Sequence, residues 1–187
     1  MADSTQAAPA ELEIVRSFVN TRDIDEDVET LTTPELLREW LVDHGLDPGT
    51  RRLTESDRRR ALELREALRA LLLANGGEPL AERPIQTLNR MSKAARLEVR
   101  FTPDGEAELA RAGAGIERAL GTLLAIVVRA MSAGTWWRLK ACREETCQWA
   151  FYDLSKNRSA HWCSMAVCGN RAKARAYRRR RTGHRQA

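Results

Sequence analysis

Apolar residues recur at helical spacing along most of the chain up to residue 134. The clearest run includes Leu64, Leu68 and Leu72; a Thr-Glu-Ser-Asp segment at 54–57 that resembles a capping box precedes it, and Asn-Gly-Gly at 75–77 ends it. A second helix is expected at Pro34, because the preceding threonine can cap its first amides. Further helices are expected over residues 12–20, from residue 84 and from residue 115. The buried stripes of these shorter helices are expected to contain Ile14, Val15, Phe18, Val19, Leu36, Leu37, Trp40, Leu41, Ile85, Leu88, Met91, Ile116, Leu120, Leu123, Leu124, Val127, Val128 and Met131.

Between the helices expected from residue 84 and from residue 115, the spacing of the apolar residues changes from helical to alternating. Leu97, Val99 and Phe101 alternate with polar residues, and Pro-Asp-Gly at 103–105 forms a turn signal, which predicts a β-hairpin with a weak return strand near residues 106–111. The acidic segment 23–29 is expected to be a loop, and residues 1–10 are expected to be disordered. The pattern therefore predicts a mainly α N-terminal domain with a β-hairpin, closing near residue 135.

Composition restricts the class of protein, and charge divides the chain into two parts. A hydrophobic share of 43% with 30% charged residues is typical of a globular protein, and no stretch reaches the roughly 20 apolar residues of a membrane span. The first residues lack the basic and apolar regions of a secretory signal, so we expect a cytoplasmic protein. Residues 138–187 carry a net charge of +10, whereas residues 1–137 carry −5. This asymmetry indicates a polyanion partner for the C-terminal part.

Four cysteines form two close pairs near the basic end. Four residues separate Cys142 from Cys147, four separate Cys163 from Cys168, and fifteen lie between the pairs. Two short-spaced pairs can surround one zinc ion with four thiolates, and metal binding would stabilise a module with few aliphatic residues. Two disulfides, free buried cysteines, or His161 in place of one ligand are the alternatives.

A closed shell of four thiolates indicates a structural rather than a hydrolytic zinc site. The chain also has no Gly-rich phosphate loop, no G-x-S-x-G and no H-E-x-x-H motif. His44, next to a glycine at a helix end, is interpreted as a helix-terminus contact rather than a catalytic base. The sequence therefore predicts a protein that is not an enzyme.

The segment after Cys168 carries eight Lys and Arg residues and no acid. On a helix, Arg171, Arg175 and Arg178 share one face, which suits contacts to a phosphate backbone, and the side chains of Asn170 and Arg171 can read base edges. A solvated basic tail is the alternative. The aromatic residues Trp149, Phe151, Tyr152 and Trp162 could stack on bases, but we interpret them as the core of the module. The candidate nucleic-acid-binding residues are Asn170, Arg171, Lys173, Arg175, Arg178, Arg179, Arg180 and Arg181.

The run Trp-Cys-Ser-Met-Ala-Val-Cys-Gly-Asn-Arg at 162–171, with Arg-Leu-Lys-Ala-Cys at 138–142 and Trp-Ala-Phe-Tyr-Asp at 149–153, closely resembles the CGNR zinc finger. In that family the finger usually follows an ABATE domain, which Phe-Val-Asn-Thr at 18–21, Trp-Leu at 40–41 and Gly-Leu at 45–46 resemble. The resemblance implies one structural Zn²⁺ held by Cys142, Cys147, Cys163 and Cys168.

The resemblance also implies a domain order and a role. Residues 1–10 would be a disordered N-terminus, 11–135 an ABATE-like helical domain, 136–182 a small treble-clef-like zinc finger with a basic helix, and 183–187 a tail. The chain would be a bacterial, nucleoid-associated, stress-induced transcription regulator that binds double-stranded DNA through the finger. Its N-terminal domain would sense a small ligand or mediate assembly, as in a homodimer. An RNA- or ribosome-associated module and a zinc-stabilised protein-interaction adaptor are the alternatives.

Overall fold

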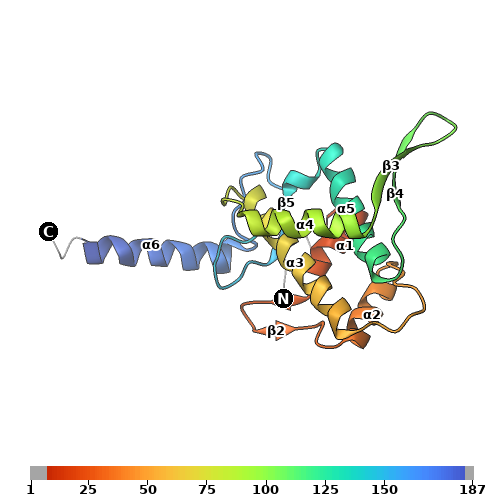
Figure 1. Ribbon diagram of the computed structural model, residues 1–187. Coiled ribbons are helices and arrows are strands. Elements are labelled where there is room, and N and C mark those ends of the chain that lie inside the picture. Colours follow the sequence, from red (N-terminus) through yellow and green to blue (C-terminus); the bar gives the residue numbers. More distant parts are fainter. Residues whose placement is uncertain (1–7, 184–187) are drawn as a thin grey trace.

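The computed structural model describes residues 8–183, with side chains described as far as Arg178 (Figure 1). About half of the chain is helical and the sheets are small, which confirms the mainly α prediction. The helices are α1 (Ala10–Val19), α2 (Pro34–Asp43), α3 (Glu55–Asn75), α4 (Glu82–Ala94), α5 (Ile116–Ser132) and α6 (Asn170–Gly183), with a 3₁₀ turn at Trp136–Arg138 and a π-helix at Met165–Gly169. Three antiparallel hairpins pair β1 (Arg22–Asp23) with β2 (Val28–Glu29), β3 (Leu97–Phe101) with β4 (Ala107–Arg111), and β5 (Leu139–Ala141) with β6 (Ala150–Tyr152).

The helix boundaries follow the capping residues of the sequence. The Thr33 hydroxyl accepts a hydrogen bond from the Leu36 amide at the start of α2, and Thr54 and Asp57 form both bonds of a capping box at the start of α3. His44 lies at the C-terminus of α2, where Nδ1 is 2.7 Å from the Trp40 carbonyl and the two rings stack. The interpretation of His44 as a helix-terminus contact is therefore confirmed.

The core lies between α1, α2, α3 and α5, and the leucine and valine stripes supply most of it. Three predicted core positions are wrong: Leu36 is 39% exposed, Ile85 is 40% exposed and Val128 is 41% exposed. Helix α4 lies on the outside of the body and packs against α3 and α5, so it buries only Thr87 and Met91 and leaves Ile85 on its outer face.

The acidic segment after α1 is a short hairpin rather than the expected loop. Arg22 pairs with Glu29 and Asp23 with Val28, and the Thr30 amide extends the ladder to the Thr21 carbonyl. Residues 1–7, expected to be disordered, lie outside the described residues, as do residues 184–187 of the expected tail; Ala8 is buried against the core.

The hairpin predicted from the change of period is present as β3 and β4, with Val99 opposite Leu109. It extends from the body on the side opposite α6 (Figure 1). Towards the tip of the hairpin the apolar residues lie outside the core, because Val99 is 63% exposed and Phe101 is 79% exposed.

The third hairpin, β5–β6, packs on α3 and α1. Its residues Leu139, Ala141, Ala150 and Tyr152 belong to the same buried cluster as the leucines of α3. Asn20, directly after α1, also forms two hydrogen bonds with the Ala150 backbone, of 2.9 and 2.7 Å. The C-terminal part is thus anchored on the N-terminal helices. None of the helices in residues 8–183 is long and apolar enough to cross a membrane.

Candidate metal centre and basic helix

Two backbone turns bring the cysteines together. Cys142 directly follows β5, and its amide donates to the Trp149 carbonyl at 3.0 Å. The turn that follows begins at Glu144. The Glu144 carbonyl accepts hydrogen bonds from the amides of Cys147 and Gln148, at 2.8 and 3.0 Å. Cys163 precedes the π-helix and Cys168 lies within it. Each close pair therefore presents its sulfur atoms from one local turn, as its spacing in the sequence predicts.

The four sulfur atoms lie within 4.8 Å of one another. The Sγ of Cys163 is 3.6 Å from that of Cys147 and 3.8 Å from that of Cys168. Thiolates bound to one zinc at about 2.3 Å in a tetrahedron are about 3.8 Å apart, whereas a disulfide bond measures about 2.05 Å. All four cysteines are free, and their arrangement can hold one zinc ion. His161 is not part of the cluster.

The electrostatics of the cluster require a cation if all four thiols are to ionise. Hydrogen bonds from Cys147 and Cys163 lower the pKa of Cys142 to about 2. The hydrogen bond with Cys142 raises the pKa of Cys147 to about 12, and hydrogen bonds with Cys142 and Cys147 raise the pKa of Cys163 further. One thiolate can thus be stabilised by its neighbours, but four need a divalent ion between them.

A buried ion pair supports the loop between the two cysteine pairs. Lys140 Nζ lies 2.7 Å from Asp153 Oδ2, both side chains are almost fully buried, and the ammonium also donates to the carbonyls of Arg158 and Ala160. The Asp153 carboxylate accepts from the amides of Ser155 and Ala160. The pair fixes the loop that leads to Cys163. Sequence reasoning missed this ion pair. Its signal was a lysine two residues before the first cysteine and an aspartate directly after the aromatic strand.

The aromatic residues near the cysteines are mainly structural. Phe151 and Tyr152 are buried, and Trp149 and Trp162 are half-buried and pack against the cysteine cluster. This arrangement agrees with the interpretation of these residues as the core of the module.

The structure brings part of the predicted basic surface together on α6. Asn170, Arg171, Arg175 and Arg178 line one shallow hollow of about 650 Å³, with Ala166, Val167 and Ala174 as its apolar part. Lys173 is exposed on the same helix. Arg179, Arg180 and Arg181 lie in α6, but their side chains are outside the described part of the chain. The helix projects away from the body (Figure 1).

Two arginines of this surface form ion pairs within the chain. Arg171 Nη1 is 2.8 Å from both carboxylate oxygens of Asp25, in the β1–β2 turn, and Arg175 Nη2 is 2.6 Å from Glu144 Oε2. Glu144 is buried, whereas Asp25 and Arg171 are partly exposed. The first pair connects the N-terminal hairpin to the basic helix, and the second connects the helix to the turn that carries Cys147.

The Asn170 side chain faces its own backbone. Its Nδ2 donates to the Ala166 carbonyl at 3.0 Å, inside the π-helix that carries Cys168. This hydrogen bond stabilises the turn that presents the last cysteine.

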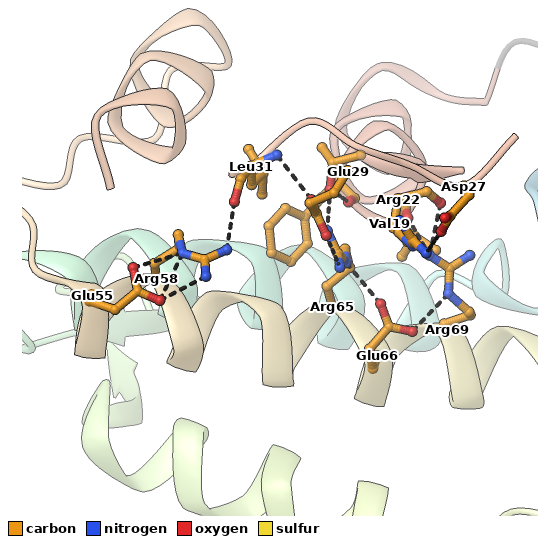
Figure 2. A network of polar contacts seen from close by, with 12 residues as sticks. Val19, Arg22, Asp27, Glu29, Leu31, Glu55, Arg58, Arg65, Glu66 and Arg69 are labelled. Atoms are coloured by element: carbon orange, nitrogen blue, oxygen red, sulfur yellow. Dashed lines mark hydrogen bonds and ion pairs between the residues drawn. The ribbon is translucent and has the colours of Figure 1, made fainter. Parts of the chain in front are cut away.

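A buried arginine network on α3 positions the hairpin that carries Asp25 (Figure 2). Arg65 binds both carboxylate oxygens of Glu29 at 2.7 Å. Arg69 donates to the carbonyls of Val19 and Arg22 and, at 2.8 Å, to that of Gln148 beside Cys147. One helix thus holds both the acidic hairpin and the cysteine turn. Sequence reasoning missed this network; its signal was the arginines interleaved with the leucine stripe of α3.

Two family models match the chain. One, described as "CGNR zinc finger", matches residues 138–181. The other, described as "ABATE: Putative stress-induced transcription regulator", matches residues 13–134, more than half of the chain. No curated protein is found to match the sequence.

Proposed function

Because the chain belongs to the ABATE family and ends in a CGNR zinc finger, we propose that it is a zinc-dependent, DNA-binding transcription regulator. Cys142, Cys147, Cys163 and Cys168 hold one structural zinc ion, which fixes the start of α6. The basic helix then contacts double-stranded DNA. In this proposal the protein is a bacterial regulator that binds rather than catalyses.

The observation that carries this proposal is the shared hollow on α6. It gathers three guanidinium groups beside the metal cluster, on a helix that leaves the body and has no acidic residue. A helix of 14 residues is about 21 Å long, and the major groove of B-DNA is about 12 Å wide, so the groove can admit it. Arginine forms bidentate contacts to phosphate and to guanine.

The residues on the helix have different proposed roles. Lys173, Arg175, Arg178, Arg179, Arg180 and Arg181 contact the phosphate backbone, and Arg171 reads a base edge or a phosphate next to the metal. The hydrogen bond from Asn170 to Ala166 favours a bracing role for Asn170 over base reading. If Asn170 instead reads bases, Asn170→Ala changes the sequence preference without weakening zinc affinity.

The test compares two double variants that remove the same charge. In Arg178→Ala with Arg179→Ala, we expect weaker binding to all duplexes and a salt dependence reduced by about 0.9 per lost phosphate contact. The control is Arg59→Ala with Arg83→Ala, because both residues are exposed on α3 and α4 and neither lines the hollow on α6. Equal effects of the two double variants would contradict a binding surface on α6.

A second arm of the experiment tests the nucleic acid and the metal. Zinc-loaded protein is titrated with labelled duplex DNA in the presence of single-stranded RNA, and Cys163→Ser serves as the variant with a broken cluster. Preference for duplex DNA that is lost in Cys163→Ser supports the proposal. Preference for RNA, or the absence of all binding at physiological salt, would overturn it.

For the N-terminal domain we propose a role in assembly, as a homodimer, rather than in sensing a small ligand. The observation that favours assembly is the β3–β4 hairpin, which holds apolar side chains in solvent. A dimer also presents two basic helices, so one assembly can make two contacts with DNA.

A further inference from the structure

One face of the β3–β4 hairpin is mostly apolar, and beyond Leu97, which packs against the core, it lacks a partner in the described structure. Leu97, Val99 and Phe101 lie on this face with Leu109 and Ala107, which are opposite Val99 and Phe101 in the other strand. Arg111, opposite Leu97, is the charged residue at the end of this face nearest the body. The hairpin contacts the body through α4 and α5. Two strands alone are marginally stable in water, and adding strands with a shared apolar face stabilises them.

The outer edge of β3 is open for hydrogen bonding. At one end of the hairpin the Ala112 amide donates to the Arg96 carbonyl at 3.3 Å. At the other end the Thr102 amide donates to the Glu106 carbonyl at 2.8 Å. Because hydrogen-bonded pairs alternate along an antiparallel ladder, the even-numbered residues of β3 bond to β4. The amides and carbonyls of Leu97, Val99 and Phe101 therefore point to the free edge, and the described sheet ends there.

The sequence of β3 is complementary to itself around Val99. Its order is apolar, acidic, apolar, basic, apolar over residues 97–101. If two copies pair antiparallel about a two-fold axis at Val99, Glu98 of each copy lies opposite Arg100 of the other, on the polar face. Leu97 then lies opposite Phe101 on the apolar face. The same operation about Leu109 on β4 places Glu108 opposite Ala110, so only β3 gains paired charges.

We propose that β3 is the dimerisation edge of this protein, and that its partner is the β3 strand of a second copy. Two hairpins then form one continuous four-stranded antiparallel sheet with an apolar stripe along one face and two Glu98–Arg100 pairs across the axis on the other. Such two-fold edge pairing satisfies the open backbone groups and closes the assembly at two chains. The inference rests on the proposed assembly role of the N-terminal domain, and it is independent of DNA binding.

The test exchanges the two charges and measures the molecular mass of the full, zinc-loaded chain by sedimentation without DNA. Glu98→Arg places two arginines opposite each other across the axis, and Arg100→Glu places two glutamates there, so each variant converts two attractive contacts into two repulsive ones. We expect each single variant to raise the dimer Kd at least about tenfold. The double variant Glu98→Arg with Arg100→Glu restores both pairs and is expected to dimerise like the original chain.

Mixing the two single variants gives the sharpest result. Their charges are complementary to each other, so an equimolar mixture is expected to form heterodimers although neither variant forms homodimers. Heterodimer formation also shows that each variant is folded. A chain that stays monomeric at all concentrations would overturn the proposal, as would single variants that dimerise normally or a mixture that stays monomeric. Because no DNA is present, failure here is distinguishable from failure of the proposed DNA binding.

Discussion

Arg171 is one of two arginines, with Arg143, whose ion pairs connect the C-terminal part of the chain to the N-terminal part. Its guanidinium pairs with Asp25 of the β1–β2 turn, and both side chains are partly exposed. An exposed ion pair contributes little to stability, whereas a guanidinium can form a bidentate contact with a DNA phosphate. Asp25 and phosphate would therefore compete for the same group, and the acid would weaken binding of the anion.

Replacing Asp25 tests this competition. In Asp25→Asn we expect affinity for duplex DNA to increase by about two- to fivefold, because Arg171 no longer has to exchange a carboxylate for a phosphate. Asp27→Asn is a matched control, since it changes the same charge in the same turn but Asp27 pairs with Arg22 instead. Binding is measured by fluorescence anisotropy at fixed salt. Equal gains in the two variants would mean that only net charge matters.

Glu29 gives the protein a pH-dependent contact within the hairpin. Burial acts to raise the pKa of Glu29, but hydrogen bonds and the charge of Arg65 outweigh it and hold the pKa below the ordinary 4.5. A lowered pKa contributes stability that is complete above pH 4.5 and is lost as the pH falls through the folded-state value. The protonated carboxyl no longer compensates the buried Arg65 guanidinium.

We therefore expect Glu29→Gln to reduce the free energy of unfolding by about 1–3 kcal/mol at pH 7. The difference between the variant and the original chain should shrink as the pH falls below about 4.5. Urea unfolding of both proteins at several pH values measures it, and the loss of zinc in acid affects both alike. A difference that stays constant with pH would show that the charge of Glu29 is not what matters.

At the scale of elements, the zinc finger consists of two parts that are stabilised by different interactions. The β5–β6 hairpin shares the core of the N-terminal helices, whereas the cysteine turns and α6 depend on the cluster. A short helix rich in like charges is marginal by itself in water. The metal therefore stabilises the second part far more than the first.

Removing zinc with a chelator should separate these parts. We expect amides of α6 and of residues 142–149 and 161–169 to lose protection from hydrogen exchange, while those of β5 and β6 stay protected by the packing of Leu139 and Ala150. Adding zinc back should restore the pattern. Loss of protection across β5–β6 to the same degree would mean that the metal also supports the hairpin.

The sequence predicts most of the elements because their signals are local. The caps at Thr33 and Thr54, the change of period at Leu97 and the cysteine spacing all depend on neighbouring residues, and all are observed. The ion pair of Arg171 with Asp25 joins residues far apart in the sequence, so no local pattern contains it. The exposure of Ile85 likewise depends on which face α4 turns to α3, which a single helix does not specify.

At the scale of the molecule, the two proposed interfaces lie at opposite ends. The basic helix α6 projects from one side of the body and the β3–β4 hairpin from the other (Figure 1). One buried core links α3 to β5 and β6, so the body between the two ends is a single packed unit. In a dimer paired through β3, the two basic helices therefore lie at the outer ends of the assembly rather than side by side.

This geometry predicts that the dimer bridges two separate DNA segments instead of binding adjacent half-sites. Protein added to a duplex immobilised on beads should capture a second, labelled duplex of the same sequence. Glu98→Arg should bind the immobilised duplex with nearly unchanged affinity but lose the capture, whereas the double variant with Arg100→Glu should regain it. Arg178→Ala with Arg179→Ala should reduce both steps, since it weakens each contact with DNA. Capture of the second duplex by Glu98→Arg as efficiently as by the original chain would separate bridging from the β3 edge and place the two basic helices on a different assembly.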